Sequence, residues 1–198
     1  MIQFNNISQE IPYLVFMDKY NESLKAKQPN IEAICISSYS TTNKEVNARF
    51  VNLKFVNDKE FIFFSNYESP KSKDFISHNQ ITAIFYWNSI NMQIRMKAKI
   101  NQTSTKFNMQ YFSQRDIKKN ALAISSKQSS RIESYDDVNR NYDKALEIDN
   151  LKLCPEYWGG YSFIPYYFEF WEGHESRLNK REVYEIKNNN WEHYYLQP

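Results

Sequence analysis

The stretch WGGYSFIPYYFEFWEGHESRLNKR, from Trp158 to Arg181, has too many aromatic residues for a surface loop. Aromatic residues favour strands, so we expect a core strand that begins at the glycine pair and ends in a turn. Arg177 and Arg181 then follow Trp171, four positions apart. Aromatic faces beside guanidinium groups suit a flat ring that carries an anionic group. A core strand followed by a solvated turn explains the same residues. The rest of the chain must therefore decide between a ligand site and a purely structural strand.

Composition favours one folded domain. The chain has 198 residues, of which 41% are hydrophobic, with 15 tyrosines, 14 phenylalanines and only 3 glycines. A chain of this length can bury a sizeable core, and its aromatic content favours packed strands over disorder. We therefore expect a single domain over residues 1–198.

Charge and cysteine usage exclude several classes of protein. The net charge of +2 is too small to argue for nucleic-acid binding. Cys35 and Cys154 have no metal-ligand spacing, which indicates free thiols in a reducing compartment. No apolar run reaches membrane-spanning length, and no signal peptide is visible. We expect a cytoplasmic protein that binds neither membranes nor nucleic acid.

Turn residues divide the chain into short apolar strands and a few helices. Residues 93–100 alternate apolar and polar side chains, which predicts a half-buried strand, whereas the apolar run 81–87 predicts a strand covered on both faces. Ser69 and Ser134 are expected to cap helices, with Asp137 completing a capping box. These elements predict a mainly β, α+β protein built on a closed or split β-barrel. The helices are expected at 11–27, 70–78, 105–115, 120–126 and after Ser134, and the strands at 31–38, 46–56, 61–64, 81–87, 93–100, from 158, at 183–187 and at 191–196.

Two cations lie in the second strand, within RFVNLK. Arg49 and Lys54 are five residues apart, which places them on opposite faces of a regular strand. Both can line one pocket only if the strand bulges, or if the site lies at a strand edge or between subunits. An exposed strand with two solvated cations is the alternative.

A strand-to-helix junction follows in FFSNYESPKSK. Ser65, Ser69 and Lys71 lie where backbone donors at a helix N-terminus and an adjacent lysine could hold a phosphate. Ordinary helix capping explains the same residues.

Two further segments carry polar groups without a clear structural role. SSKQSSR, residues 125–131, has neither apolar periodicity nor glycine, and its central Gln128 and Ser129 could bind the polar edge of a cofactor or form a solvated loop. Tyr111 and Arg115 are one helical turn apart and could share an anion, although helix-surface pairs of this kind are usually structural.

Side-chain chemistry alone does not supply a catalytic centre. His78, His174 and His193 have no metal-ligand spacing, so no metal site is expected. No serine lies in a nucleophile elbow, and no glycine-rich phosphate loop is present. An enzyme built from this sequence would need a cofactor to carry the chemistry.

Four motifs in this order resemble the pyridoxine (pyridoxamine) 5′-phosphate oxidase family: RFVNLK, FIFFSNYES with Lys71, SKQSS, and WGGY…EFW-G…RL--R. The resemblance extends from about Ile11 to Pro198. It implies an FMN-binding split β-barrel with inserted helices, and a homodimer with FMN bound between its subunits. It also implies a helical lead-in over residues 1–28 and a segment for dimerisation and the site over residues 156–198.

The resemblance also implies the reaction and the residues that serve it. The reaction is oxidation of pyridoxamine or pyridoxine 5′-phosphate to pyridoxal 5′-phosphate, with oxygen as electron acceptor. Arg177 and Asn179 match catalytic positions. The substrate-binding positions are Lys54, Tyr111, Arg115, Lys119, Arg177 and Asn179. The FMN-binding positions are Arg49, Phe50, Val51, Asn52, Leu53, Lys54, Phe64, Ser65, Lys71, Gln93, Gln128, Ser129, Trp171 and Arg181.

The sequence departs from the family pattern at five positions. Pro70 replaces an arginine that usually contacts the FMN phosphate, which leaves Lys71 and Arg49 to carry that charge. Lys119 replaces a serine at the substrate phosphate. Asn179 and Lys180 replace a His-Asp pair, and Ile124 replaces a tryptophan. These changes concern the substrate pocket more than the flavin site.

Three other functions remain open. The first is a related FMN-dependent oxidase with another substrate, as in the phenazine-biosynthesis branch of the fold, which the changes at Lys119, Asn179 and Lys180 favour. The second is a non-catalytic protein that binds FMN or pyridoxal phosphate. The third is a nucleic-acid-binding barrel, based on the alternating cations of residues 95–99, which lack interleaved aromatic platforms.

Overall fold

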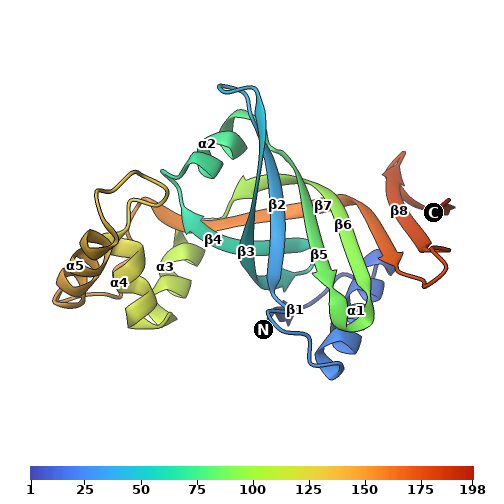
Figure 1. Cartoon of the computed structure of the whole chain (residues 1–198), viewed down its shortest axis with the longest axis horizontal. Helices are drawn as coiled ribbons and strands as arrows, with labels where there is room; N and C mark the ends of the chain where they lie inside the picture. The colour runs from blue at the N-terminus through green and yellow to red at the C-terminus, as the bar shows by residue number, and fades with distance from the viewer.

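The computed structural model describes residues 1–198 and shows one sheet of nine strands with five α-helices. Figure 1 shows the strands at the centre, with three helices grouped at one end. The strands are β1 (Gln3–Asn5), β2 (Ala33–Ser40), β3 (Glu45–Asn57), β4 (Glu60–Asn66), β5 (Gln80–Trp87), β6 (Met92–Gln102), β7 (Trp158–Glu172), β8 (Lys180–Lys187) and β9 (Asn190–Leu196). The helices are α1 (Ile11–Lys25), α2 (Pro70–Ser77), α3 (Thr105–Gln114), α4 (Ile117–Ser125) and α5 (Tyr135–Leu146), with a short 3₁₀ turn at Asn88–Ile90.

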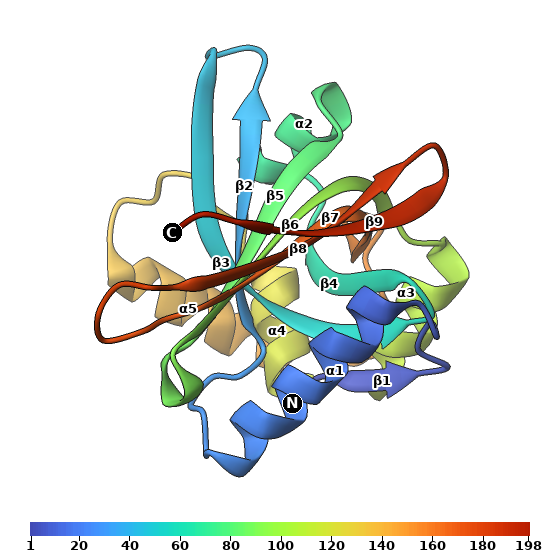
Figure 2. The same ribbon diagram turned by 90° about the vertical axis from the view of Figure 1, so that its right-hand side faces the viewer.

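The strand pairings close into a barrel. The sheet runs in the order β3-β2-β5-β6-β7, and β4 pairs with both β3 and β7. These six strands therefore form a closed ring, which removes most free sheet edges. The hairpin of β8 and β9 continues from the second half of β7 and lies outside the ring (Figure 2).

Aromatic side chains fill the barrel, and α1 packs against one part of this core. Tyr13 and Phe16 of α1 are fully buried. The Phe16 ring lies edge-on to Phe61, with centroids 5.1 Å apart, and Phe61 stacks on Phe163 of β7 at 5.3 Å. Burying side chains of this size is the main contribution to stability in a domain of this kind.

The glycine pair at the start of β7 allows α3 to approach the barrel. A Cβ atom on Gly159 would lie 2.1 Å from the Tyr67 hydroxyl, and one on Gly160 would lie 2.5 Å from the Thr103 hydroxyl. In the space that the glycines leave, Asn108 of α3 accepts a hydrogen bond from the Gly160 amide at 2.8 Å. The glycines therefore fix the position of the helical lobe, residues 105–157.

Most predicted elements are confirmed, including the strand from residue 158, the C-terminal hairpin and the capping box of Ser134 and Asp137. Two details are wrong. Ser69 stands at the N-cap of α2, but its hydroxyl donates to the Asn66 carbonyl at 2.8 Å and does not cap the helix. The strand β5 is buried on one face only, and Tyr86 on the other face is 57% exposed. None of the helices has both the length and the apolarity needed to span a bilayer.

Candidate functional site

A cavity of about 400 Å³ opens between the barrel and the helical lobe. The barrel contributes side chains from β3, β4 and α2, and the lobe contributes side chains from α3 and the loop after α4. All of the lining residues were predicted as cofactor or substrate contacts. They are Arg49, Phe50, Val51, Asn52, Lys54, Phe64, Ser65, Lys71, Tyr111, Arg115, Gln128 and Ser129.

The backbone of β3 explains how Arg49 and Lys54 reach one cavity. Residues 45–52 pair only with β2, and pairing with β4 begins at Leu53, so the strand has a free edge beside the cavity. The register with β4 then shifts between Leu53 and Phe55, which leaves Lys54 in a bulge. A bulge redirects a side chain that a regular strand would send to the other face. Two of the arrangements that allow Arg49 and Lys54 to line one pocket, a strand edge and a bulge, are therefore present.

Lys71 is a buried cation without a carboxylate partner. Its side chain is at the first turn of α2, and the residue is only 8% exposed. The ammonium group donates to three neutral oxygens: Ser65 Oγ at 2.9 Å, Ser69 Oγ at 3.0 Å and Gln128 Oε1 at 2.8 Å. Burial, assisted by the nearby Arg49, lowers the pKa of Lys71 to about 8. A buried ammonium group of this kind fits a site for an anionic ligand.

Gln128 connects the loop after α4 to the barrel. Its Oε1 accepts hydrogen bonds from Ser65 Oγ at 3.0 Å as well as from Lys71. The next residue, Ser129, has a left-handed backbone with φ of 67° and lines the same cavity. The loop is thus held against the site by one side chain.

Arg49 is held by groups that the sequence did not reveal. Its guanidinium donates to Ser38 Oγ at 2.8 Å and to the Ile36 carbonyl at 3.2 Å, and lies 3.9 Å from Asp74 Oδ2. Burial lowers the pKa of Arg49, and the charge of Asp74 opposes that effect. Asp74 is itself buried and accepts from Ser38. No local pattern marks Ser38 or Asp74 as site residues, because only the fold brings them to Arg49.

The lobe side of the cavity combines stacked rings with a second group of cations. The Tyr111 ring stacks on Phe64, with centroids 4.0 Å apart, and the Arg115 guanidinium lies 5.2 Å from the centre of the Trp158 ring. Burial lowers the pKa of Lys54, and the charges of Lys119 and Arg115 lower it further, whereas Glu32 opposes them. No carboxylate lines the cavity. Its electrostatics therefore favour a ligand, or a pair of ligands, with more than one negative charge.

The remaining predicted residues lie elsewhere in the chain. Gln93, Trp171 and Arg181 face one another in a single row across β6, β7 and β8. In Figure 1, β8 lies at the opposite end of the molecule from α3, α4 and α5. One copy of the chain therefore brings the predicted site residues together in two separate groups.

Three other predicted residues lie outside these two groups. Leu53 is fully buried in the core, so only its backbone can reach a ligand. Arg177 lies in the β7–β8 loop with φ of 59°, and its amide donates to the His174 carbonyl at 2.9 Å. Asn179 Oδ1 accepts from the His174 amide at 3.0 Å and so braces the same loop.

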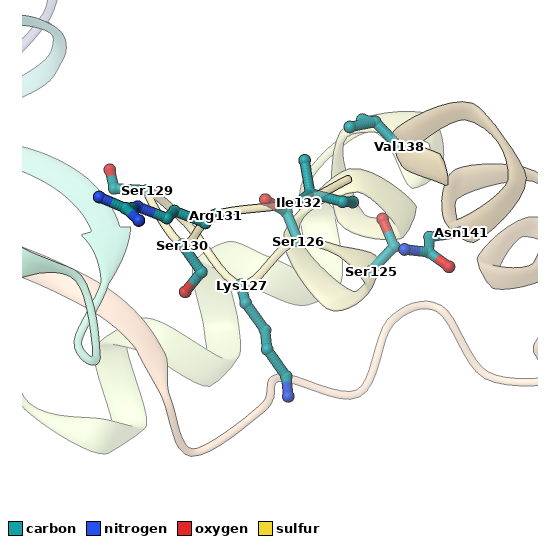
Figure 3. A pocket seen from close by; sticks show the side chains of 9 residues that line it. All are labelled: Ser125, Ser126, Lys127, Ser129, Ser130, Arg131, Ile132, Val138 and Asn141. Carbon is teal, nitrogen blue, oxygen red and sulfur yellow. The ribbon is translucent and has the colours of Figure 1, made fainter. Parts of the chain in front are cut away.

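A second hollow lies on the other side of the SKQSS loop. It measures about 360 Å³, and serine hydroxyls from the loop and from α4 make up much of its lining, with Val138 and Asn141 of α5. Figure 3 shows Lys127 pointing away from the other labelled side chains, and Arg131 extending towards Ser129. The charged groups of this hollow do not converge, in contrast to those around Lys71.

Comparisons with known proteins agree with this architecture. The family model described as the pyridoxine 5′-phosphate oxidase C-terminal dimerisation region matches residues 158–198. A pyridoxine/pyridoxamine 5′-phosphate oxidase from Janthinobacterium sp. (strain Marseille) is 30% identical over 189 residues, which cover 94% of this chain and 89% of that protein. PhzG from Burkholderia lata 383, solved in complex with tetrahydrophenazine-1-carboxylic acid, has a TM-score of 0.88 at 20% identity, over 94% of this chain and 92% of that one. A pyridoxamine 5′-phosphate oxidase-related, FMN binding protein from Nostoc punctiforme PCC 73102 has a TM-score of 0.78 at 9% identity, over 96% and 99%.

The fold is that of the FMN-binding split-barrel proteins, as predicted. The match to the Janthinobacterium protein extends over nearly the whole chain. The chain therefore belongs to the pyridoxine/pyridoxamine 5′-phosphate oxidase family. The two structural neighbours share too little sequence to say more than that the fold is common.

Proposed function

We propose that the protein is an FMN-dependent oxidase that converts pyridoxamine or pyridoxine 5′-phosphate to pyridoxal 5′-phosphate, with oxygen as electron acceptor. The observation that carries this proposal is the cavity of four cations, Arg49, Lys54, Lys71 and Arg115, with no carboxylate in its lining. A flavin phosphate and a substrate phosphate together would supply the negative charge that this cavity lacks.

The residues present fit the FMN phosphate. Lys71 is buried and bonded only to neutral oxygens, so a phosphate would give it the anionic partner that the chain does not provide. Ser65 lies beside it as a hydroxyl donor, and Arg49 adds a second charge. The absence of the usual arginine at Pro70 makes Lys71 the main cation of this subsite. When bound, FMN supplies the two-electron acceptor that none of the side chains can provide.

The lobe side of the cavity fits the substrate phosphate. Lys54 and Arg115 would bind the phosphate, with the Tyr111 hydroxyl as a third contact and Lys119 nearby. Arg177 and Asn179 would lie at the reacting end of the substrate. In this proposal the protein contributes orientation and charge placement, while the flavin and oxygen supply the redox chemistry.

The proposal requires two copies of the chain. The Gln93–Trp171–Arg181 row is separate from the cavity in one copy, so a second copy would bring its own row to the flavin. The match of residues 158–198 to a dimerisation region supports this arrangement. The exposed face of β5 around Tyr86 would be covered in such a dimer. We accordingly propose a cytoplasmic homodimer of single-domain subunits, with the site at the subunit interface.

A related oxidase with a different substrate is the second candidate. Lys119, Asn179 and Lys180 change the substrate side of the site, and the fold is shared with PhzG, which was solved with an aromatic carboxylic acid. A non-catalytic FMN or pyridoxal phosphate carrier is the third candidate, because these changes affect reaction residues and leave the cationic cavity intact.

One experiment separates the candidates. The purified protein, reconstituted with FMN, is mixed without oxygen with pyridoxamine 5′-phosphate or pyridoxine 5′-phosphate, and the visible flavin absorbance is followed. We expect the absorbance to bleach as aldehyde forms and, after air is admitted, to return with formation of peroxide. A bound flavin that stays oxidised with both compounds would contradict the proposed substrate, and a protein that never takes up FMN would contradict both oxidases and leave only a carrier of pyridoxal phosphate.

A further inference from the structure

A carboxylate is buried in the aromatic strand β7. Glu169 is only 2% exposed and lies two residues before Trp171, on the same face of the strand. Buried carboxylates in strands are rare because desolvation is costly, and they remain ionised only with strong partners. The charge within FEFW is therefore a sequence signal for a buried ion pair.

Two guanidinium groups share this carboxylate. Arg181 on β8 directs both Nε and Nη2 to Glu169 Oε1, each at 2.8 Å. Arg95 on β6 directs its Nε to Oε2 at 3.0 Å, and the Tyr167 hydroxyl donates to the same oxygen at 3.1 Å. Burial alone would raise the pKa of Glu169, but the hydrogen bonds from Arg95 and Arg181 outweigh it, and the pKa lies below its ordinary value.

These contacts fix Arg181 beside Trp171. The far side of the guanidinium is held as well, because Nη1 donates to the Gln197 carbonyl at 3.0 Å. A free arginine side chain loses rotamer entropy when it is ordered on a ligand, and a side chain already held in place does not incur that loss again. The carboxylate also reduces the local charge from two cations to one, whereas no carboxylate lines the main cavity.

We infer that Glu169 is a positioning residue for the flavin, which acts by holding the guanidinium of Arg181 in its row with Trp171 and Gln93. This inference rests on the proposed function, since it requires that Arg181 contact FMN. A carboxylate that serves folding alone is the competing explanation, and it would change stability without changing the affinity of the folded protein for FMN.

The test measures the FMN dissociation constant by quenching of flavin fluorescence, with the melting temperature followed in parallel. Glu169→Gln removes the charge at nearly constant size, and we expect it to raise the dissociation constant about tenfold or more, since a charged fork is lost. Glu169→Asp keeps the charge but is one methylene too short to hold both arginines. We expect it to retain most of the stability and still to weaken binding.

The matched control is Glu182→Gln. Glu182 lies in the same sheet and is held by Lys180 at 2.6 Å and by the Tyr184 hydroxyl at 2.8 Å. Glu182 pairs with Phe170, the residue that follows Glu169 in β7. Its side chain therefore lies on the opposite face of the sheet from that of Glu169. Its loss should lower the melting temperature and leave the FMN dissociation constant within about twofold of the wild type.

A double variant shows whether Glu169 acts through Arg181. If it does, Glu169→Gln weakens FMN binding in the wild type and has no further effect in Arg181→Ala, because coupled residues are not additive. Additive losses, or unchanged FMN binding in both Glu169 variants, would overturn the inference while leaving the proposed function in place. A wild-type protein that does not bind FMN would overturn both.

Discussion

The affinity of the protein for FMN should fall as the pH rises above 8, because Lys71 loses its proton. In the free protein the pKa of Lys71 is about 8, since the ammonium is buried without a carboxylate. A bound phosphate dianion favours the charged lysine, so the complex retains a proton that the free protein has lost. The logarithm of the dissociation constant should therefore rise by up to one for each pH unit above 8. Over two pH units this is a loss of up to about 100-fold, or roughly 2.7 kcal/mol.

Fluorescence titration of FMN between pH 7 and 10 measures this dependence. The range lies above the second phosphate pKa of about 6, so the charge of the phosphate stays constant. Lys71→Met should bind FMN weakly and with no slope in this range. Lys73→Met, which removes an exposed lysine from the same helix, should keep the slope of the wild type. A flat wild-type profile, or an equal slope in Lys71→Met, would refute the role assigned to Lys71.

The lowered pKa of Lys71 has the opposite effect on the stability of the free protein, which should rise with pH. The folded-state pKa of Lys71, about 8, lies below the ordinary value of 10.5, so between these two values the unfolded chain binds more protons than the folded chain. Unfolding free energy should thus increase with pH across this window, by up to about 3 kcal/mol from Lys71. Below pH 8, Lys71 is protonated in both the folded and the unfolded state, so it contributes no pH dependence to the free energy of unfolding. Denaturant titrations of wild type and Lys71→Met, compared at the two ends of the window, isolate it.

Five further substitutions test other parts of the structure. Arg115→Ala should lower kcat/KM for the phosphorylated substrate by about 30-fold, equivalent to about 2 kcal/mol for a lost charged hydrogen bond, with FMN content unchanged by absorbance. Arg177→Ala should reduce turnover far more than flavin content, whereas Arg181→Ala should release flavin; equal losses of both in either variant would show that the roles are misassigned. Gly159→Ala should destabilise the protein by about 2 to 4 kcal/mol in thermal unfolding, because the added Cβ would lie 2.1 Å from a tyrosine hydroxyl, and an unchanged melting temperature would contradict the close approach of α3. Tyr86→Glu places a charge on the exposed face of β5 and should give monomers in sedimentation that bind FMN weakly, while a dimer with full affinity would locate the subunit interface elsewhere.

The sequence predicted the strands because they depend on local patterns, whereas the cavity residues were expected as a set only through the family resemblance. The alternation in β6 and the aromatic run of β7 are visible without any tertiary information, and the motif residues around Lys71 do lie together. Ser38 and Asp74 could not be predicted, because a helix and a strand distant in sequence bring them to Arg49. The expectation that β5 is covered on both faces failed for a related reason: a continuous apolar run shows that a face needs cover, but not whether the cover comes from the same chain.

The unpaired edge of β3 offers main-chain groups to a ligand, and substitution of side chains does not easily remove them. Residues 49–52 lie in the closed ring but pair with β2 alone, so the peptide groups that point away from β2 have no strand partner. A ligand seated there can bond to main-chain atoms and so take the place of a missing neighbouring strand. Recognition of the ligand at this edge depends on the course of the backbone and not on the side chains of Phe50, Val51 and Asn52.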